Sequence, residues 1–522
     1  MKKLIILILF LTVSTNGVYA QNVPSENVVE ELTCQIIDQS DKRPVVFATV
    51  SIKDKNNGVI ADEDGNFRLP YKYKTQNDVL IISCIGYETK TIAVTTLSDN
   101  NLNIIFLKPK IEALNTVTIT TKKDKPKANY ENVRDIVGKA IANMRVNYPT
   151  THHSFIGYYR DYQLLESRYF NLNEGIVEVF DAGFQTNKLL YKDNQSALYE
   201  FNQNSKFPKD TLLTAAYDNQ KYKYIKDATI SSIGGNELSI LNVHNAIRNS
   251  AYHSFSFVHT FKDNFLYNHE FRIANKLYLD DIPIYEIKFT ANEDVTGVKN
   301  TANGVIYIAQ DSYAIHKLEY YGFVVGDSDP FFSIKIEYAP KGKKMFLNYI
   351  SFNNKFEVRS RNDFEIEDVS YDKGENAFFV RFNNTVDKTT IANSKNFRFI
   401  YKKRKLKINK VTLDNGKTVK ISLISGAIPS NEELNEAQMK ELKYRIKKVT
   451  DISGRALNKK TFIEVNQFRE LFVQEVFERK VMPKNLIYVN KSKSLNNSIV
   501  NSDASINSSD YWINSPLKAT KN

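Results

Sequence analysis

Histidine is the side chain that most often carries acid–base or metal chemistry near neutral pH. All seven histidines of this chain lie between residues 152 and 316. His316 and Glu319 have the H-x-x-E spacing of a zinc site, but the third ligand of such a site is a downstream histidine, and none follows His316. On a strand, an offset of three residues also points two side chains to opposite faces. We therefore interpret this spacing as accidental.

Four other histidines lie near one another in the sequence: His244, His253, His259 and His269. His253 and His259 would share a strand face, but metal sites normally combine tight local ligand pairs with supporting carboxylates. Ordinary half-buried histidines are the better interpretation. The chain also lacks a G-x-S-x-G elbow, a phosphate-cradling glycine loop and an H-E-x-x-H motif. The sequence predicts a protein that is not an enzyme, with no catalytic, cofactor-binding or metal-binding residues and no cofactor.

Aromatic and basic clusters are the remaining candidates for binding. Tyr158-Tyr159-Arg160 and Tyr320-Tyr321 offer ring surfaces for a carbohydrate or lipid, yet aromatic residues in strands more often form core and cross-strand contacts. The densest basic stretch lies within residues 402–410, where alternation places most charges on one strand face. We expect that face to be solvated rather than to bind a partner.

The elements that would position these residues are mostly strands. The 522 residues suggest three or four folding units, and the 42% of hydrophobic residues supplies buried cores. Thirty Tyr and 32 Phe, with only 19 Gly, favour β structure. The composition therefore predicts a mostly β protein.

The first twenty residues have the layout of a cleaved signal peptide: Lys2 and Lys3, an apolar run, and a small-residue exit ending at Ala20. The run is too short to span a bilayer, and no Cys follows Ala20 to carry a lipid anchor. We expect an exported chain without a transmembrane helix after cleavage. Its formal net charge falls from +12 to +10, and export makes nucleic acid an improbable partner.

Residues 31–121 alternate between short strands and turns. At Asp62 to Phe67 the chain turns, and Gly65 can adopt the positive φ that such a turn requires. The alternating oxygens of Asp62, Asp64 and Asn66 also suggest a calcium loop. In an EF-hand-like loop, however, the distal glutamate would fall at Tyr73, so a simple turn is the better account.

This region resembles the carboxypeptidase regulatory-like domain. The matching residues are Ile36-Ile37-Asp38, Pro44 to Val50, Gly58, Asp62, Gly65-Asn66-Phe67 and Ile82 to Tyr87. The resemblance implies a seven-stranded prealbumin-like sandwich that carries no catalytic residues of its own. Cys34 departs from the family, which usually has Gly at this position. Cys34 and Cys84 lie in apolar segments of the same region, so we favour two unpaired core thiols over a disulfide.

A charged linker at 118–127 separates this region from a helix that Asn129 can cap and that Pro149 stops. Long aromatic-rich strands follow, to about residue 356. We expect residues 129–362, continued by 460–480, to form a large curved antiparallel sheet with one helix. The strand rhythm is weakly similar to the periplasmic lipoprotein-carrier fold, whose half-open barrel holds a lipid tail.

Shorter strands between the two parts of the predicted large sheet resemble a bacterial Ig-like domain of the surface-layer type, which would occupy residues 363–459. The segment from Thr450-Asp451 to Gly454 is the most specific part of this resemblance. We expect this sandwich to interrupt the large sheet, because hairpin tips tolerate insertions. The tail at 485–522 is rich in Asn, Ser and Lys, so we expect it to be mostly disordered, with Tyr511 and Trp512 as a docking pair.

As a whole, the chain resembles exported proteins that contain a carboxypeptidase-like regulatory domain. This resemblance implies a non-enzymatic binding or scaffolding protein of the periplasm, outer membrane or cell surface, with an envelope protein, a glycan or a lipid as partner. The alternative is a periplasmic carrier that holds a lipid or lipoprotein acyl chain in the concave face of the central sheet. The sequence leaves open the partner's identity, the side of the outer membrane and the oligomeric state.

Overall fold

The computed structural model describes residues 30–112, 132–188, 190–214, 217, 223–225, 236–252, 260–262, 264–359, 364–429, 434–459, 462–501, 506 and 510–517. The predicted signal segment 1–20, the linker at 118–127 with Asn129, and the pair His253 and His259 lie outside these residues. Five sheets make up most of the described chain, which confirms the mostly β class.

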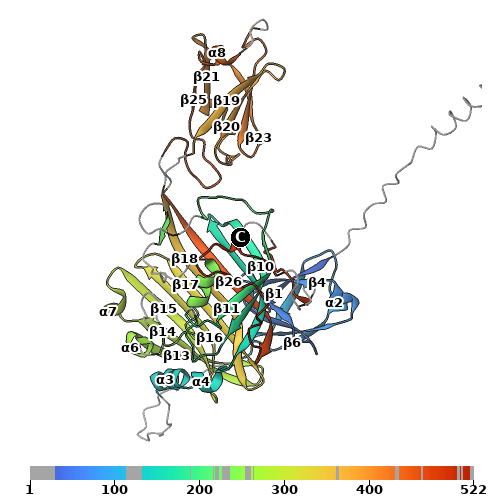
Figure 1. Ribbon diagram of the computed structural model, residues 1–522, viewed down its shortest axis with the longest axis vertical. Helices are drawn as coiled ribbons and strands as arrows, with labels where there is room; N and C mark the ends of the chain where they lie inside the picture. The colour runs from blue at the N-terminus through green and yellow to red at the C-terminus, as the bar shows by residue number, and fades with distance from the viewer. Residues whose placement is uncertain are drawn as a thin grey trace, which may run out of the picture.

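Two small sheets form a sandwich near the N-terminus, and we call it the first sandwich (Figure 1). Its sheets have the orders β4-β1-β7 and β3-β2-β5-β6, and alternate side chains of β1 and β4 are buried between them. The strands are seven in number, which is the number that the resemblance to the carboxypeptidase regulatory-like domain implies. Their bounds, with those of two short helical turns, are β1 Glu31–Asp38, β2 Thr49–Ile52, β3 Gly58–Ile60, β4 Asn66–Pro70, α2 Lys72–Thr75, β5 Val79–Ser83, β6 Lys90–Ala93, η1 Val94–Thr96 and β7 Asn103–Leu107.

The turn before β4 agrees with the sequence interpretation. Gly65 has φ +70°, and a Cβ at this position would lie 2.5 Å from the carbonyl oxygen of Ile36. The carboxylate of Asp62 accepts hydrogen bonds from the backbone N–H groups of Asp64 (3.0 Å) and Asn66 (2.9 Å). This buried carboxylate therefore closes the turn, as an Asx turn does.

The central element is a 12-stranded sheet with the order β11-β10-β9-β26-β18-β17-β16-β15-β14-β13-β8, to which β12 adds beside β18. All of its strand pairs are antiparallel. The strand bounds are β8 Ile111–Glu112, β9 His153–Leu165, β10 Arg168–Asp181, β11 Gln195–Gln203, β12 Lys223–Ile225, β13 His269–Leu279, β14 Ile282–Ala291, β15 Asn300–Ala309, β16 Ile315–Val324, β17 Phe332–Lys341, β18 Lys344–Arg359 and β26 Phe462–Glu478. The turn helix α7 Glu293–Thr296 joins β14 to β15.

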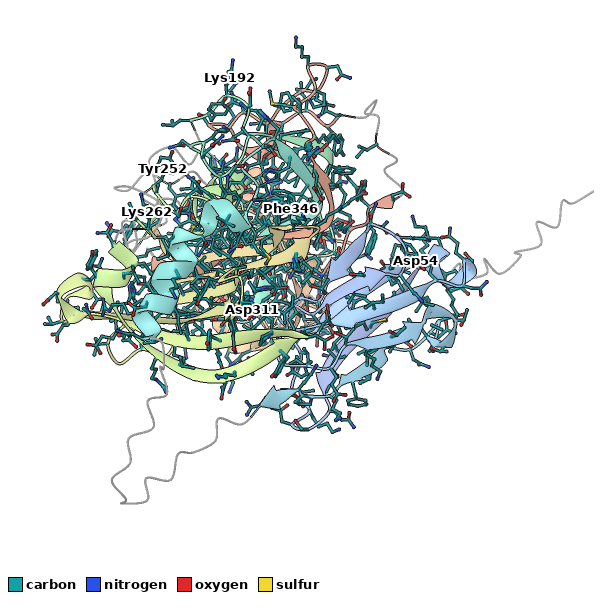
Figure 2. The ribbon with its side chains drawn as sticks, turned by 90° about the horizontal axis from the view of Figure 1, so that it is seen from below. Asp54, Lys192, Tyr252, Lys262, Asp311 and Phe346 are labelled. Atoms are coloured by element: carbon teal, nitrogen blue, oxygen red, sulfur yellow. The ribbon has the colours of Figure 1, made fainter. Side chains whose placement is uncertain are left out.

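The two faces of this sheet are covered differently, and Figure 2 shows the helices and the first sandwich on its two sides. Side chains such as Tyr159 and Ile306 pack against helices on what we call the helix face. Tyr158 and Tyr349 pack against Phe47 and Ile60 of the first sandwich on what we call the sandwich face. Successive side chains of a strand alternate between the two faces, so neighbouring buried residues such as Tyr158 and Tyr159 enter different cores.

Four helices lie over the helix face: α3 Val133–Ala142, α4 Met144–Asn147, α5 Glu237–Val243 and α6 Asn264–Asn268. The cap of α3 is Asn132, whose side chain accepts from the N–H of Arg134 (3.1 Å). The sequence predicts only one helix here, since α5 and α6 are too short to show a helical repeat of apolar residues. No helix among the described residues is long and apolar enough to cross a membrane.

Residues between β18 and β26 form two further sheets, β19-β20-β24-β23 and β22-β21-β25, around a separate core (Figure 1). We propose on this basis that residues 363–459 are an inserted Ig-like domain, which we call the second sandwich. The basic stretch at 402–410 presents its charged residues to solvent. Bounds are β19 Ile366–Asp372, β20 Ala377–Phe382, η2 Ser394–Asn396, β21 Phe397–Tyr401, β22 Arg404–Lys405, β23 Ile408–Asn415, β24 Thr418–Leu423, α8 Glu436–Met439 and β25 Lys443–Ile446.

The tail differs from the expectation of disorder over residues 485–501 and 510–517. Val489 and Leu495 are buried in the core of the helix face, and Leu495 is the first residue of the short helix η3 Leu495–Asn497. Trp512 enters the core of the first sandwich and Tyr511 enters the core of the sandwich face. The polar composition hides these few apolar anchors, which is why the sequence indicates only the docking pair.

Candidate functional site

A polar cavity of about 430 Å³ lies at the helix face. Its walls come from β9, β10, β11, α5, the segment around Tyr217 and the tail at 492–496. Most of the lining side chains carry amide, hydroxyl or carboxyl groups: Asp161, Gln163, Asn173, Thr214, Tyr217, Asn236, Glu237, Ser492, Ser494 and Asn496. A polar surface of this size, with buried groups such as Asp161, Gln163 and Asn173, is unusual between a sheet and helices, and we take it as the candidate site.

Asp161 is the acid at the centre of this lining. One carboxylate oxygen accepts from the hydroxyl of Tyr159 and the other from the amide of Asn173, each at 3.0 Å. Burial, together with the nearby carboxylate of Glu237, raises the pKa of Asp161 to about 7 against the opposing effect of these hydrogen bonds and of Arg469. Asp161 is therefore an acid that exchanges its proton near neutral pH.

Arg469 neutralises the second acid of the cavity. Its guanidinium pairs with Glu237 at the start of α5. It also donates to the amide oxygen of Asn354 (2.7 Å) and to the hydroxyl of Tyr217 (3.0 Å). The result is a buried ion pair held by hydrogen bonds on several sides, which keeps both side chains in fixed positions.

Asn173 and Lys223 add two further buried polar groups. The Oδ1 atom of Asn173 is buried and has no hydrogen-bond partner within the described chain, although its amide group donates to Asp161. Such an orphaned acceptor is able to accept a hydrogen bond from a ligand or from water. Lys223 donates to the carbonyl of Leu213 (2.9 Å) and lies over the rings of Tyr217 and Phe356, and burial lowers its pKa to about 8.

Strand pairing brings these residues together. β9 and β26 pair so that Asp161 lies opposite Arg469 and Gln163 lies opposite Gln467. Asn236 caps α5, because its side chain accepts from the N–H of Ser239 (2.8 Å), and its amide group donates to the tail at Asn490 and Lys493. One side chain therefore positions both the helix and the tail segment that close the cavity.

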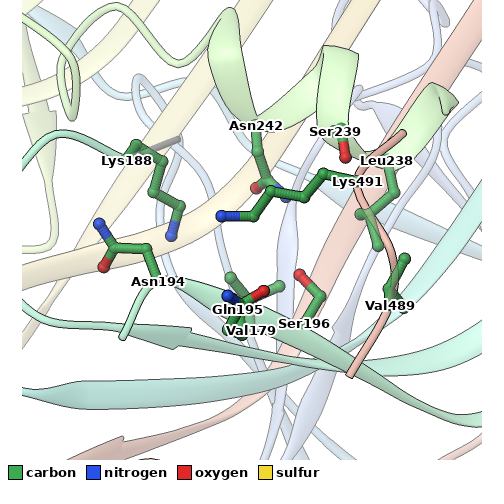
Figure 3. A pocket seen from close by; sticks show the side chains of 10 residues that line it. All are labelled: Val179, Lys188, Asn194, Gln195, Ser196, Leu238, Ser239, Asn242, Val489 and Lys491. Atoms are coloured by element: carbon green, nitrogen blue, oxygen red, sulfur yellow. The ribbon is translucent and has the colours of Figure 1, made fainter. Parts of the chain in front are cut away.

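A much smaller cavity, of about 20 Å³, lies next to the polar cavity along α5 (Figure 3). The amino groups of Lys188 and Lys491 both point into it. Burial and the charge of Lys188 lower the pKa of Lys491 to about 8. The volume suits about one water molecule, so this cavity does not compete as a ligand site.

The ion cluster beside Lys188 is structural. Asp181 accepts from Lys188 (2.8 Å) and, through both oxygens, from Arg248 (2.7 and 2.8 Å). Burial would raise the pKa of Asp181, but the two cations hold it well below its usual value. Arg248 also donates to Thr186, so the cluster joins the loop after β10 to the segment after α5.

The apolar part of the helix face is filled by side chains. Ile136 and Val137 of α3, Ile240 of α5 and Phe265 of α6 are buried against the sheet. The carrier alternative predicts instead a deep cavity lined by Phe, Ile and Leu. Over the described part of this face, the large cavity is the polar one, so the packing does not favour an acyl-chain carrier.

His244, His269 and His316, the described histidines among those that the sequence singles out, are separate core residues. His244 stacks on Phe352 at 3.8 Å, and His269 contacts the hydroxyl of Tyr320 at 2.9 Å. His316 is buried as well, and burial lowers the pKa of each of the three to about 4. Among the residues that the structure describes, no group of three or more His, Cys, Asp or Glu residues is placed to hold a metal ion.

Both cysteines are unpaired thiols in this structure, with Cys34 buried and Cys84 half-buried. Burial raises the pKa of each thiol to about 12, which makes both poor nucleophiles. The aromatic pairs behave as expected for packing, because Tyr158, Tyr159 and Tyr320 are buried.

Sequence reasoning missed the cavity residues altogether. The available signal lay in β9, where Asp161 and Gln163 alternate with Tyr residues in a segment that is otherwise core. Their partners Glu237 and Arg469 are far along the chain, so spacing offers no motif to find them.

Comparison with solved structures finds two distant matches. A LolA superfamily protein from Nitrosomonas europaea is 11% identical, with a TM-score of 0.18, and a DUF1329 family protein from Desulfovibrio piger is 9% identical, with a TM-score of 0.19. Each match covers 42% of this chain and 85% of the other. At these scores neither match carries an argument about function.

Comparison with curated proteins finds a match to the TonB-dependent receptor SusC of Bacteroides thetaiotaomicron, 31% identical over 118 residues. The match covers 23% of this chain and 10% of SusC, so the chain spans about a tenth of that relative's length. The family model of the CarboxypepD_reg-like domain matches residues 32–119. The first sandwich of this chain is therefore a CarboxypepD_reg-like domain, which is a regulatory and non-catalytic domain.

Proposed function

We propose that this chain is a non-enzymatic binding or scaffolding protein of the cell envelope, exported to the periplasm or to the outer-membrane surface. The layout of residues 1–20 supports export. The local similarity of the chain to SusC, named a TonB-dependent receptor, supports an envelope setting. An envelope protein or a glycan is the partner that this setting favours.

The polar cavity is the observation that carries the binding role. Its lining is held by hydrogen bonds between Asp161, Tyr159 and Asn173 and by the pair of Arg469 with Glu237. A fixed set of polar groups around a partly open space is what a specific binding site requires.

The same geometry speaks against hydrolysis in this cavity. Two carboxyl groups, Asp161 and Glu237, are the minimum set for cleaving a glycosidic bond. Glu237, however, is neutralised by Arg469, and both oxygens of Asp161 already accept hydrogen bonds. A carboxylate paired with a guanidinium, as Glu237 is, is a weak base and a weak nucleophile, so the described lining of the cavity lacks a second free carboxylate and binding is the better-supported role.

The first sandwich supports a scaffolding role, because it is fixed to the sheet. The ring of Phe47 stacks on Tyr349 at 4.4 Å, and Glu63 pairs with Lys335 at 2.7 Å. The tail adds a clamp, in which the indole N–H of Trp512 donates to the carbonyl of Arg68 (3.0 Å) and the amide of Gln474 donates to the carbonyl of Trp512 (2.7 Å).

Fractionation of a Gram-negative host that expresses the full chain tests this proposal. We expect the protein in the periplasmic or outer-membrane fraction, with a mature N-terminus at Gln21. Lipid extraction of the purified protein should yield no stoichiometric acyl chain, whereas a bound lipid would favour the carrier alternative. Retention of the uncleaved protein in the cytoplasm would contradict the proposal.

A further inference from the structure

We propose that the helix-face cavity binds a neutral saccharide of one or two sugar units. The inference rests on the proposed function, because it names the chemical class of the ligand that the binding site would take. It is carried by the size of the cavity, by its hydrogen-bonding groups and by its charge balance.

The size of the cavity sets the first limit. Its volume of about 430 Å³ lies toward the lower end of the roughly 300–1,000 Å³ typical of small-molecule sites. An extended polymer or a long acyl chain would need a longer groove. One or two sugar rings are compatible with this space.

The hydrogen-bonding groups favour a ligand with several hydroxyls. Oδ1 of Asn173 is an acceptor without a partner in the described part of the chain, and only 7% of Asn173 is exposed. It therefore needs a donor from a ligand or water. Ser492, Ser494 and Asn496 of the tail also line the cavity and add groups that both donate and accept. A hydroxyl likewise does both, so a polyhydroxylated ligand matches this mixed lining.

Two aromatic rings complete the lining. Phe201 on β11 and Tyr217 both border the cavity and are only half-buried. An aromatic face packs against the C–H surface of a flat ring while polar neighbours bind its hydroxyls. A mixture of ring faces and planar amides around one space suits a sugar better than an inorganic ion.

The charges favour a neutral ligand. Glu237 is paired with Arg469, and Lys223 is directed to a backbone carbonyl, with its charge over two rings. Asp161 is surrounded by the neutral donors Tyr159 and Asn173. The cavity therefore presents no excess of one charge that would select a phosphate or a polyamine.

Isothermal titration of the purified full chain tests the inference. The probes are glucose, galactose, N-acetylglucosamine, maltose and cellobiose, with putrescine and inorganic phosphate as charged alternatives and dodecanoate as an apolar one. We expect heat and a rise in melting temperature with at least one of the neutral sugars and with none of the other three. Binding of only a charged or apolar probe, or of no probe, overturns the inference.

Matched variants locate the binding. Asn173→Leu removes the orphaned acceptor in the cavity, and Asn353→Leu removes another buried amide oxygen without a partner among the described residues, outside the lining of the cavity. We expect Asn173→Leu to weaken sugar binding about tenfold, the effect of one lost hydrogen bond of about 1.4 kcal/mol, and Asn353→Leu to change it less than twofold. Equal losses in both variants would contradict the assignment.

Phe201→Ala gives a second readout if Asn173→Leu does not fold, since Phe201 is half-buried at the cavity wall. It should also weaken sugar binding at least fivefold, and unchanged affinity would overturn the assignment. Fractionation and titration distinguish the failure of this inference from the failure of the proposed function. A protein in the envelope fraction that binds no sugar refutes only the sugar-binding inference. A sugar-binding protein in the cytoplasm refutes only the envelope role.

Discussion

Two neighbouring residue pairs on β9 and β26 have opposite surroundings. On the sandwich face, Arg160 lies opposite Glu470, and its Nε donates to one carboxylate oxygen at 2.5 Å while Tyr349 donates to the other at 2.8 Å. On the helix face, Asp161 lies opposite Arg469, but the guanidinium is directed to Glu237. The same two strands therefore build a direct ion pair on one side and an acid bonded by neutral groups on the other.

This difference separates stability from binding. The sandwich face packs aromatic rings around its charges, since the guanidinium of Arg160 also lies 5.0 Å from the ring centre of Phe472. The helix face leaves a polar space beside Asp161 and an orphaned oxygen on Asn173. We infer that substitutions on the sandwich face mainly cost stability, whereas substitutions around the cavity mainly change ligand and proton binding.

The largest loss of stability is expected from Glu470→Ala on the sandwich face. It leaves the buried Arg160 without its carboxylate, which should lower the free energy of unfolding by about 3–5 kcal/mol. Urea unfolding measures this. The control is Glu367→Gln, which breaks the exposed pair with Arg381 and should cost less than about 1 kcal/mol. Equal effects would remove the distinction between buried and exposed pairs.

Phe47→Ala tests the contact between the first sandwich and the sheet. Phe47 is 1% exposed, so loss of its ring should cost about 3 kcal/mol in urea unfolding. Its φ of +57° is strained for a bulky residue. Phe47→Gly should therefore be less damaging than Phe47→Ala, by up to about 1 kcal/mol. If Gly were the worse replacement, the backbone strain would be refuted.

Asp161→Asn tests the helix face through pH. Burial raises the pKa of Asp161 from its ordinary value of 3.8 to about 7 in the folded chain, so the folded chain holds the proton more tightly than the unfolded chain. Stability therefore falls as pH rises from about 4 to 7, and the variant should escape this fall, with a gain of up to about 4 kcal/mol over wild type by pH 8, at about 1.4 kcal/mol per pKa unit. Thermal unfolding at several pH values measures the difference.

Asp62→Asn provides the comparison for that experiment. Burial raises the pKa of Asp62 to about 6, despite the charge of Arg160 and hydrogen bonds from the turn. Its difference from wild type should therefore be complete by about pH 7, one unit below the pH at which that of Asp161→Asn is complete. Identical pH profiles for the two variants would show that Asp161 has no special environment.

The smallest effect is expected from Asn353→Leu. Its buried amide oxygen has no hydrogen-bond partner among the residues described, so its removal forfeits no bond to that oxygen. The free energy of unfolding should stay within about 1 kcal/mol of wild type in urea unfolding. A loss above about 2 kcal/mol would show that this amide is bonded in solution.

Local patterns predicted much of the architecture. The alternation from Glu31 to Leu107 and the glycine of the turn indicated the first sandwich, because strand period and positive φ are local properties. The cavity had no such signal. Asp161, Glu237 and Arg469 come from three distant segments, and only strand pairing and the docking of α5 bring them together.

The tail shows the same limit. Its Asn, Ser and Lys content predicted disorder, yet Val489, Leu495 and Trp512 are buried in two different cores. These few apolar residues hold the tail in place because they are buried in cores that the rest of the chain provides. The average composition of the tail does not reveal them.

The sequence by itself determined that Arg160 and Asp161 point to opposite faces of a strand, since side chains alternate with a period of two. Only the tertiary structure decided which face is covered by the first sandwich and which by α5 and the tail. The reason is physical: the cost of burying a charge depends on the partners that distant segments bring to it, and these are absent from the local sequence.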